Sequence, residues 1–143
     1  MLVSHILRQK GRDVVTVAPS IALAEAARTL ARRKIGAVVV IGAKGEVAGI
    51  LSERDIVHAL ATDGVNALSR AVSTYMTRSV AICEEQDTVD TIMATMTEGR
   101  FRHVPVVEAG RLAGIISIGD VVKTRIEESE REANHLKQYI SAG

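Results

Sequence analysis

The chain has 143 residues, 47% of them hydrophobic and 24% charged, with a formal net charge of +1. This length suits one compact domain, or two small halves that share one core, and leaves no room for a separate catalytic domain. The composition is that of a folded globular chain, and no stretch approaches the ~18 apolar residues of a membrane span. The near-neutral charge predicts no general attraction to nucleic acid or to an anionic membrane.

The N-terminus and the cysteine content bear on the cellular compartment. The first residues, MLVSHILRQKGRD, lack the unbroken apolar stretch and the small-residue cleavage site of a signal peptide. The single cysteine, Cys83, cannot form an internal disulfide, and its place in the apolar run VAIC predicts a buried small hydrophobic residue. We therefore expect a cytoplasmic protein.

One pattern occurs twice along the chain, from about Val14 to Val57 and from about Ser79 to Val122. IGAVVVI in the first copy matches FRHVPVV 66 residues later, and the leading glycines of GILSERD and GIISIGD are 65 residues apart. A repeat of this size predicts two copies of one supersecondary unit.

The first copy opens with a short strand, and a helix follows because apolar residues recur at the spacing i, i+3, i+4, i+7: Leu23, Ala26, Ala27 and Leu30. The β-branched runs AVVVI and VAGIL flank the turn GAKGE, which predicts a hairpin. A second helix begins at the serine of GILSERD, and we expect three apolar residues on its buried side: Ile56, Val57 and Leu60.

The second copy repeats this order, with a helix marked by Val89, Ile92, Met93 and Met96. The strands HVPVV and LAGII flank the turn EAGR, and a last helix begins at the serine of GIISIGD, with Val121 and Val122 expected on its buried side. The predicted fold class is therefore α/β (α+β), with two strand-helix-strand-strand-helix repeats related by a pseudo-twofold axis. Each repeat is too small to bury its apolar faces alone, so the two should pack together.

The repeats suggest a division of the chain into three segments. We expect the first repeat with its lead-in over residues 1–70, the second repeat over 71–126 and a C-terminal helical tail over 127–143.

GILSERD and GIISIGD each place a serine three residues before an aspartate. One interpretation is structural, because [ST]xxD fits a capping box in which the serine caps a helix and the acid reaches back. The other is a ligand site, because a strand-to-helix junction presents free N–H groups and the positive end of the helix dipole. The motif occurs twice at matching positions, and a capping box prefers Glu or Gln to Asp, which favours the ligand site. An anion site beside a carboxylate that accepts both hydroxyls of a cis-diol describes a nucleotide pocket.

On these residues the chain resembles a CBS-domain pair, or Bateman module, of the small, free-standing bacterial type. The resemblance covers roughly residues 1 to 126, including the lead-in segments VSHIL and VSTYM. It implies an adenine nucleotide bound in clefts between the repeats, with AMP first and ADP, ATP, NAD(H) and S-adenosylmethionine as alternatives. It also implies a homodimer, head-to-head or head-to-tail, in the form of a flat disc.

The resemblance assigns residues to two clefts, which we name by their aspartates. In the Asp120 cleft, Asp120 would hold the ribose hydroxyls and Ser117 the phosphate or ribose. Arg102 and His103 would lie close to the phosphates, and the opposite wall would come from the first repeat, around Thr16, Ile35 and Gly36.

In the Asp55 cleft, Asp55 and Ser52 would take the equivalent roles, with Arg54 as a candidate phosphate partner. The far wall would be made by Ser79, Ala81 and Phe101. The first repeat has Gly-Ala where the second has Arg-His, so we expect unequal sites, with the Asp120 cleft the better one for a charged nucleotide. Structural alternatives stay open, because the arginines could be solvated surface charges and the histidine a hydrogen-bonded edge residue.

No catalytic or metal-binding pattern accompanies these motifs. The four histidines show no HxxxH or HExxH spacing, and no glycine-rich phosphate loop carries a lysine. We therefore expect no enzyme activity, no metal and no catalytic cofactor.

The C-terminal tail has an apolar spacing of its own. From Val122, small or apolar residues follow at intervals of 4, 3, 4, 3 and 4: Ile126, Ser129, Ala133, Leu136 and Ile140. This spacing predicts that the last helix of the second repeat runs on for about 35 Å and presents a seam to a partner. The alternative is that the tail packs onto the chain's own repeats.

These observations predict a regulatory ligand-binding module that senses adenine nucleotides between its repeats and signals through a dimer or an unknown protein partner. The alternative is a scaffold protein with vestigial pockets that acts through its C-terminal helix. We expect neither nucleic acid nor membrane as a partner.

Overall fold

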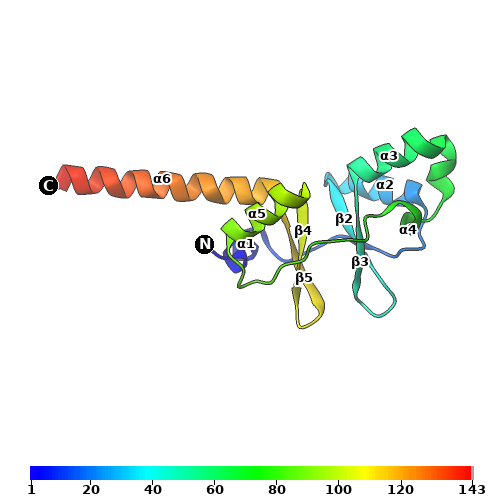
Figure 1. The fold of residues 1–143 in the computed structure, drawn as a ribbon, viewed down its shortest axis with the longest axis horizontal. Coiled ribbons are helices and arrows are strands. Elements are labelled where there is room, and N and C mark those ends of the chain that lie inside the picture. The colour runs from blue at the N-terminus through cyan, green and yellow to red at the C-terminus, as the bar shows by residue number, and fades with distance from the viewer. Residues whose placement is uncertain (143) are drawn as a thin grey trace.

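Two similar α/β halves and a long C-terminal helix make up the computed structural model, which describes residues 1–142 (Figure 1). The predicted tail residue Gly143 lies outside the described residues. The first half contains β1 (Thr16–Val17), α2 (Leu23–Arg33), β2 (Ala37–Ile41), β3 (Val47–Ser52) and α3 (Glu53–Asp63). The second contains α5 (Val89–Gly99), β4 (His103–Glu108), β5 (Arg111–Ser117) and α6 (Ile118–Ala142). The remaining elements are the lead-in helices α1 (Val3–Lys10) and α4 (Val72–Tyr75) and the 3₁₀ helix η1 (Gly64–Ser69).

Both halves are built on a β-hairpin, as the β-branched runs predict. In the first half β2 pairs antiparallel with β3 and parallel with β1. In the second half β4 pairs antiparallel with β5, and the place of a first strand is taken by one parallel bridge between Cys83 and Val106. The strand pairing shifts register at matching positions of the two hairpins, Val40/Ile41 and Val106/Val107. The repeat therefore includes this irregularity of the strands.

The helices that precede each hairpin bury the faces that the sequence predicts, namely Leu23, Ala26 and Leu30 in α2 and Val89, Ile92 and Met96 in α5. The prediction for the second helices was partly wrong. Ala59 faces the core from α3, whereas Val57 is 64% exposed and lines a cavity between the halves. In α6 Val121 is fully buried and Val122 is 47% exposed. The end of the preceding strand fixes the rotation of each helix, and periodicity over one turn could not supply it.

The two lead-in segments are exchanged between the halves. Val3, Ile6 and Leu7 of α1 belong to the apolar core of the second half, and Val72 of α4 belongs to that of the first half. Isolated bridges join Leu2 to Thr88 and Ala22 to Ala71, so each lead-in also ties down the start of a helix in the opposite half. The molecule therefore has two cores, each completed by the other half's lead-in, rather than the single shared core that the length suggested.

The repeated glycines of GILSERD and GIISIGD lie where these lead-ins cross the hairpins. A Cβ at Gly49 would be 2.6 Å from the carbonyl oxygen of Thr77, whose backbone exchanges hydrogen bonds of 2.9 and 3.0 Å with Ile50. A Cβ at Gly114 would be 2.7 Å from a methyl group of Leu7. Both glycines permit close packing of a lead-in on a strand.

The two glycines should differ in how strictly they are required. Gly49→Ala should lower the free energy of unfolding by about 1–3 kcal/mol, because a hydrogen-bonded backbone oxygen has to move. Gly114→Ala should cost less, because the flexible Leu7 side chain can rotate away. Urea denaturation of both variants measures the difference, and equal losses would contradict this account.

Candidate functional site

Both serine-aspartate motifs form helix caps. Asp55 Oδ2 accepts hydrogen bonds from the backbone N–H of Ser52 at 2.9 Å and from its hydroxyl at 3.1 Å, and the Asp55 N–H donates to Ser52 Oγ at 3.3 Å. In the second motif the Ser117 N–H donates to Asp120 Oδ2 at 2.9 Å, and the Asp120 N–H donates to Ser117 Oγ at 3.2 Å. The capping interpretation is therefore confirmed. A capping carboxylate can still bind a ligand, because it has about four acceptor sites and the cap does not use all of them.

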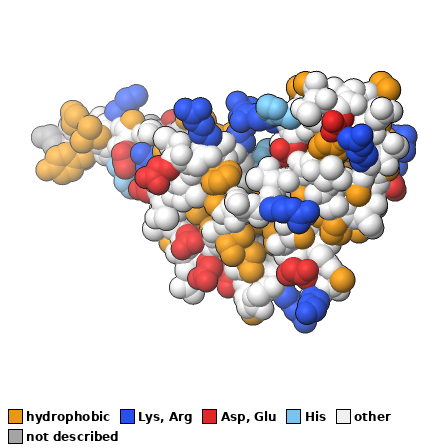
Figure 2. Space-filling view, turned by 45° about the vertical axis from the view of Figure 1, so that its right-hand side comes forward, with side chains coloured by type: hydrophobic (Ala, Val, Ile, Leu, Met, Phe, Trp, Pro, Cys, Tyr) orange, Lys and Arg blue, Asp and Glu red, His pale blue; other side chains and the backbone are white. Residues whose placement is uncertain are grey.

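A sizeable cavity lies between the two halves, and Asp55 is among the residues that line it. Its volume is about 580 Å³, within the usual range for small-molecule sites. Basic groups converge on it from Arg54, Arg100, Arg102 and His103, and its apolar lining comes from Ile50, Val57, Val80 and Phe101. In Figure 2, Lys or Arg and His side chains gather along the upper edge of the molecule. The cavity thus combines an anion-attracting rim with an apolar interior.

Asp55 is fixed at one wall of this cavity by elements of both halves. Its Oδ2 is held by Ser52 at the end of β3, and its Oδ1 accepts a hydrogen bond of 3.2 Å from Thr77 Oγ1. Thr77 follows α4, the lead-in that packs on the first half. The start of α3, where the helix dipole is positive, faces the cavity beside this carboxylate.

The opposite wall is the turn that joins α5 to β4. Arg100 ends α5 in the left-handed conformation with φ 56° and ψ 33°, which reverses the chain. The Phe101 ring lies directly over Gly99, where a Cβ would leave it no room. The carbonyl of Arg102 accepts a hydrogen bond of 2.8 Å from the N–H of Ile118, which fixes the start of β4. Backbone geometry thus holds Arg100 and Arg102 at the mouth of the cavity.

His103 stands between the two clefts. Its ring lies against Gly36, with 3.5 Å between its Cε1 and the position of a Cβ there. Burial lowers the pKa of the His103 imidazole, as do the positive charges of Lys10 and Arg102, while Asp120 and Glu53 oppose them. The ring is therefore neutral near pH 7 and can either donate or accept a hydrogen bond.

The Asp120 cleft is closed by Lys10. The Lys10 ammonium donates to Asp120 Oδ2 at 2.7 Å and to the carbonyl oxygen of Ile115 at 2.9 Å. A small cavity of about 70 Å³ beside Asp120 is lined by residues of α1 and α6, Lys10 among them. Burial alone would raise the pKa of the Asp120 carboxyl, but hydrogen bonds from Lys10 and from the Ser117 backbone, together with the Lys10 charge, lower it. Asp120 is thus an ion-pair partner in this structure.

The lengths of the lead-in helices explain the difference between the clefts. α4 ends at Tyr75, so Thr77 is extended and pairs with Ile50 beside Asp55. α1 continues to Lys10, and its side chain reaches Ile115 and Asp120 in the second half. One additional helical turn therefore places an ammonium group where the other half has a small hydroxyl.

The structure distributes several predicted site residues differently from the sequence analysis. Arg102, His103 and Gly36 line the Asp55 cavity, although they were assigned to the Asp120 cleft. The start of β4, where Arg102 and His103 lie, faces the start of α3 in the other half. Residues at a strand start therefore line the cleft that belongs to the other half's helix. Ser52, Arg54, Asp55 and Phe101 line the same cavity, as assigned.

Four other predicted residues lie elsewhere. Thr16 lines a separate surface cavity of about 570 Å³ beside α2, and Ile35 packs against the core of the first half. Val80 lines the Asp55 cavity, whereas Ser79 and Ala81 are not among its lining residues, as expected when successive residues of an extended chain face opposite sides. The predicted preference for the Asp120 cleft stays a prediction, and the ion pair between Lys10 and Asp120 argues against it.

Sequence reasoning missed Thr77, Arg100 and Lys10. The repeat carried a signal for Arg100, because the matching residue 66 positions earlier, Lys34, is also basic. In the structure both residues end their helices with a positive φ, of 55° and 56°. The end of α1 could not be placed from the sequence, so nothing pointed Lys10 toward Asp120.

Two other kinds of site, a metal centre and a membrane span, are absent from the described part of the chain. Among residues 1–142 no group of three His, Cys, Asp or Glu side chains could hold a metal ion, and no helix could cross a membrane. Cys83 is buried as predicted, and burial, followed by the charges of Asp87, Glu108 and Glu84, raises the pKa of its thiol to about 12. Cys83 is therefore a packing residue in the folded protein.

Comparisons with known proteins agree with this architecture. A family model described as "CBS domain" matches residues 3–62 and 72–127. The chain is similar to the CBS-domain containing protein ATU1752 from Agrobacterium tumefaciens, with 57% identity and a TM-score of 0.84, over 87% of this chain and 92% of that one. It is also similar to the CBS domain pair of protein MJ0100, solved in complex with 5′-methylthioadenosine and S-adenosyl-L-methionine, with 28% identity and a TM-score of 0.78, over 90% and 98% of the two chains.

A curated relative gives the same result over nearly the whole chain. The mitochondrial CBS domain-containing protein CBSX3 of Arabidopsis thaliana is 28% identical over 149 residues, which cover 99% of this chain and 72% of that protein.

Replacement of Lys10 should change how stability depends on pH. A carboxyl with a lowered folded pKa stabilises the protein above its ordinary pKa of about 4, and this contribution is lost as the pH falls through the folded value. Lys10→Met should therefore lower the free energy of unfolding by about 1 kcal/mol at pH 7, and this loss should shrink below pH 4. Urea titrations from pH 3 to 7 test this, with Lys44→Met in the hairpin turn as control. A loss that stays constant with pH would contradict the ion pair.

Proposed function

Because the chain belongs to the CBS-domain family, we propose that it is a regulatory module that senses an adenine nucleotide in the Asp55 cleft. One observation carries the proposal: a cavity of about 580 Å³ between the halves joins the Asp55 carboxylate, the start of α3 and three arginines. The carboxylate would accept the ribose hydroxyls. The first turn of α3 and the arginines would hold the phosphates, and the aliphatic lining would enclose the adenine.

The charges of the cavity favour a ligand with phosphates. Arg54, Arg100 and Arg102 line it against two carboxylates, those of Glu53 and Asp55. The related MJ0100 module is described in complex with 5′-methylthioadenosine and S-adenosyl-L-methionine, which supports an adenosine-containing ligand class. S-adenosylmethionine has a sulfonium cation and no phosphate, so the arginines argue against it here. We therefore place AMP first and ADP, ATP and NAD(H) next.

The proposal includes one ligand per chain, because Lys10 occupies the Asp120 cleft. The bound nucleotide would bridge the two halves and change their relative stability, and a homodimer or a partner protein would respond to that change. We place this module in the cytoplasm and assign it a regulatory rather than a catalytic role.

A second candidate function has an observation in its favour. The C-terminal part of α6 projects from the body and exposes Leu136, Tyr139 and Ile140. A scaffold protein that acts through this helix, with unused clefts, would show the same feature. Nucleotide binding separates the two functions.

The first test compares matched substitutions in the two clefts. With AMP, ADP, ATP or NAD(H) at about 1 mM, a Kd near 10 μM would add about 2.7 kcal/mol of stability and raise the Tm by several degrees. Asp55→Ala should remove this ligand-induced rise and Asp120→Ala should leave it, whatever each cap contributes to the Tm itself. Arg102→Met should weaken binding and Arg111→Met, in the exposed hairpin, should not. If no ligand raises the Tm, the scaffold function is favoured. If the rise is lost only in Asp120→Ala, the nucleotide site lies in the Asp120 cleft instead.

The neutral state of His103 generates a second test. A phosphate beside the ring would raise the lowered His103 pKa, so binding would take up a proton and strengthen as the pH falls from 7.5 to 6. The nucleotide phosphate titrates in the same range, with a pKa near 6. The informative quantity is therefore the ratio of the Kd values of wild type and His103→Gln, measured by calorimetry at each pH. This ratio should change with pH, and a constant ratio would remove His103 from the phosphate site.

A further inference from the structure

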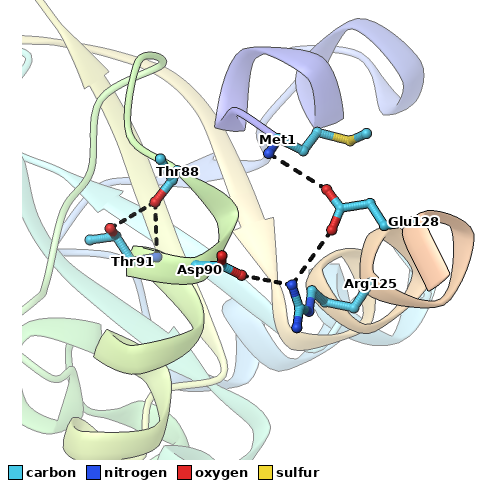
Figure 3. A network of polar contacts seen from close by, with 6 residues as sticks. All are labelled: Met1, Thr88, Asp90, Thr91, Arg125 and Glu128. Atoms are coloured by element: carbon cyan, nitrogen blue, oxygen red, sulfur yellow. Dashed lines mark hydrogen bonds and ion pairs between the residues drawn. The ribbon is translucent and has the colours of Figure 1, made fainter. Parts of the chain in front are cut away.

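The root of α6 is fixed to the second half. Val121 and Thr124 are buried, and Arg125 contacts Asp90 at 2.9 Å and Glu128 at 3.6 Å. The N-terminal ammonium of Met1 lies 3.5 Å from Glu128, so α5, α1 and α6 meet in one polar network (Figure 3). The direction of α6 is therefore set by contacts with the body.

Beyond this root, α6 extends from the body along the long axis of the molecule (Figure 1), and every residue from Ser129 to Ser141 is exposed. The prediction that the tail forms one continuous helix with α6 is confirmed, and the alternative that it packs on the chain's own repeats is wrong. The seam is exposed along its length, with Ile126 54%, Leu136 62% and Ile140 69% accessible. From Val122 to Ile140 it runs for about 27 Å.

The charges that flank this seam distinguish two ways of pairing it with a second copy. In heptad terms Ile126, Ala133 and Ile140 occupy a positions, and Val122, Ser129 and Leu136 occupy d positions. The charged residues at the flanking g positions are Arg125 and Glu132, and those at the flanking e positions are Lys123, Glu130 and Lys137.

In a parallel pair, each g residue faces the e residue five positions later on the partner helix. Arg125 then faces Glu130, and Glu132 faces Lys137, so all four flanking contacts are attractive. In an antiparallel pair centred on the seam, e faces e and g faces g. Glu132 then faces Glu132, Glu130 faces Glu130, and Lys123 faces Lys137, which are all repulsive.

We propose that the exposed seam of α6 pairs with α6 of a second copy of this chain, in parallel and in register. This rests on the homodimer named in the proposed function and gives it an orientation. A parallel pair has its twofold axis along the helices. Because α6 points away from both halves, the axis sets each half beside its counterpart in the partner, a head-to-head arrangement. An antiparallel pair would hold the two bodies at opposite ends of the tails.

The composition of the seam limits how strongly the tails pair. Ser129 and Ala133 bury little apolar surface, so the tails set the orientation and register of a dimer to which the bodies contribute as well. The Asp55 clefts of the two copies would then lie at the same end of the tail pair, related by the twofold axis, where ligand binding can alter contacts between the bodies.

Cysteine cross-linking of the full chain tests the orientation. Leu136→Cys should form a disulfide-linked dimer under mild oxidation, because d residues face each other in a parallel pair, and Gln138→Cys, on the outer face, should not. Native Cys83 can remain because it is buried. In an antiparallel pair Leu136 would face Ile126. Cross-linking only in a mixture of Ile126→Cys and Leu136→Cys, or equal cross-linking of Gln138→Cys, would therefore overturn the proposal.

Charge reversal tests the register by a route that needs no oxidation. Glu132→Lys or Lys137→Glu alone should weaken the dimer on the order of tenfold in Kd, and the double variant should recover, because the swapped pair is again attractive in parallel. In an antiparallel pair Lys137→Glu alone would instead strengthen the dimer, because the new carboxylate would face Lys123, and Glu132→Lys would only exchange one like-charge pair for another. Arg131→Glu, on the outer face, is the control. Analytical ultracentrifugation gives the Kd values.

Leu136→Glu separates this proposal from the proposed function. The residue is exposed in the single chain, so the variant should fold, bind nucleotide as wild type does and dimerise at least tenfold more weakly. An unchanged dimer, or a wild-type chain that is monomeric at 100 μM (about 1.5 mg/ml), would overturn the tail pairing while the nucleotide result stands by itself.

Discussion

The exchange of the lead-in segments is the constraint on which the rest of the structure depends. Each half is a hairpin with two helices, and a unit of about 45 residues buries too little apolar surface to be stable alone. α1 completes the core of the second half and α4 that of the first, so neither half is complete without chain from the other. The cavity between the halves is therefore framed by elements that cannot separate without opening both cores. A ligand that spans it would act on the stability of the whole molecule.

The same exchange makes two similar clefts chemically different. Each lead-in ends beside the aspartate of the half on which it packs. After α4 the chain is extended and offers the Thr77 hydroxyl to Asp55, whereas α1 continues and offers the Lys10 ammonium to Asp120. A hydroxyl leaves the carboxylate available to a ligand, while an ammonium forms an ion pair with it and compensates its charge. The asymmetry therefore arises from the length of one helix and not from the repeated motifs themselves.

The aspartates at the helix starts combine a structural and a ligand-directed property. As caps they hold the junction between strand and helix, which gives the carboxylate a fixed position. A fixed carboxylate suits a diol, but it also repels a phosphate at the same helix start. Arg54, Arg100 and Arg102 around the Asp55 cavity supply the opposite charge. Asp120 is instead paired with Lys10, so among the described residues the two properties come together around Asp55.

Local patterns in the sequence determined the elements of this protein and their order. The periods of α2 and α5, the two hairpins, both caps and the continuous α6 all depend on residues close together in the chain, and the structure confirms them. Tertiary structure alone decided how the halves face each other. The sequence placed Arg102 and His103 beside Asp120, because they share a repeat, but the pseudo-twofold packing also brings both to the Asp55 cavity, while His103 stays within reach of the Asp120 charge. Lys10 lies 110 residues from Asp120, and no local pattern reports a contact of that separation. The apolar spacing of α6 likewise could not predict whether its seam is exposed, because the same stripe can pack on the chain's own surface or on a second chain.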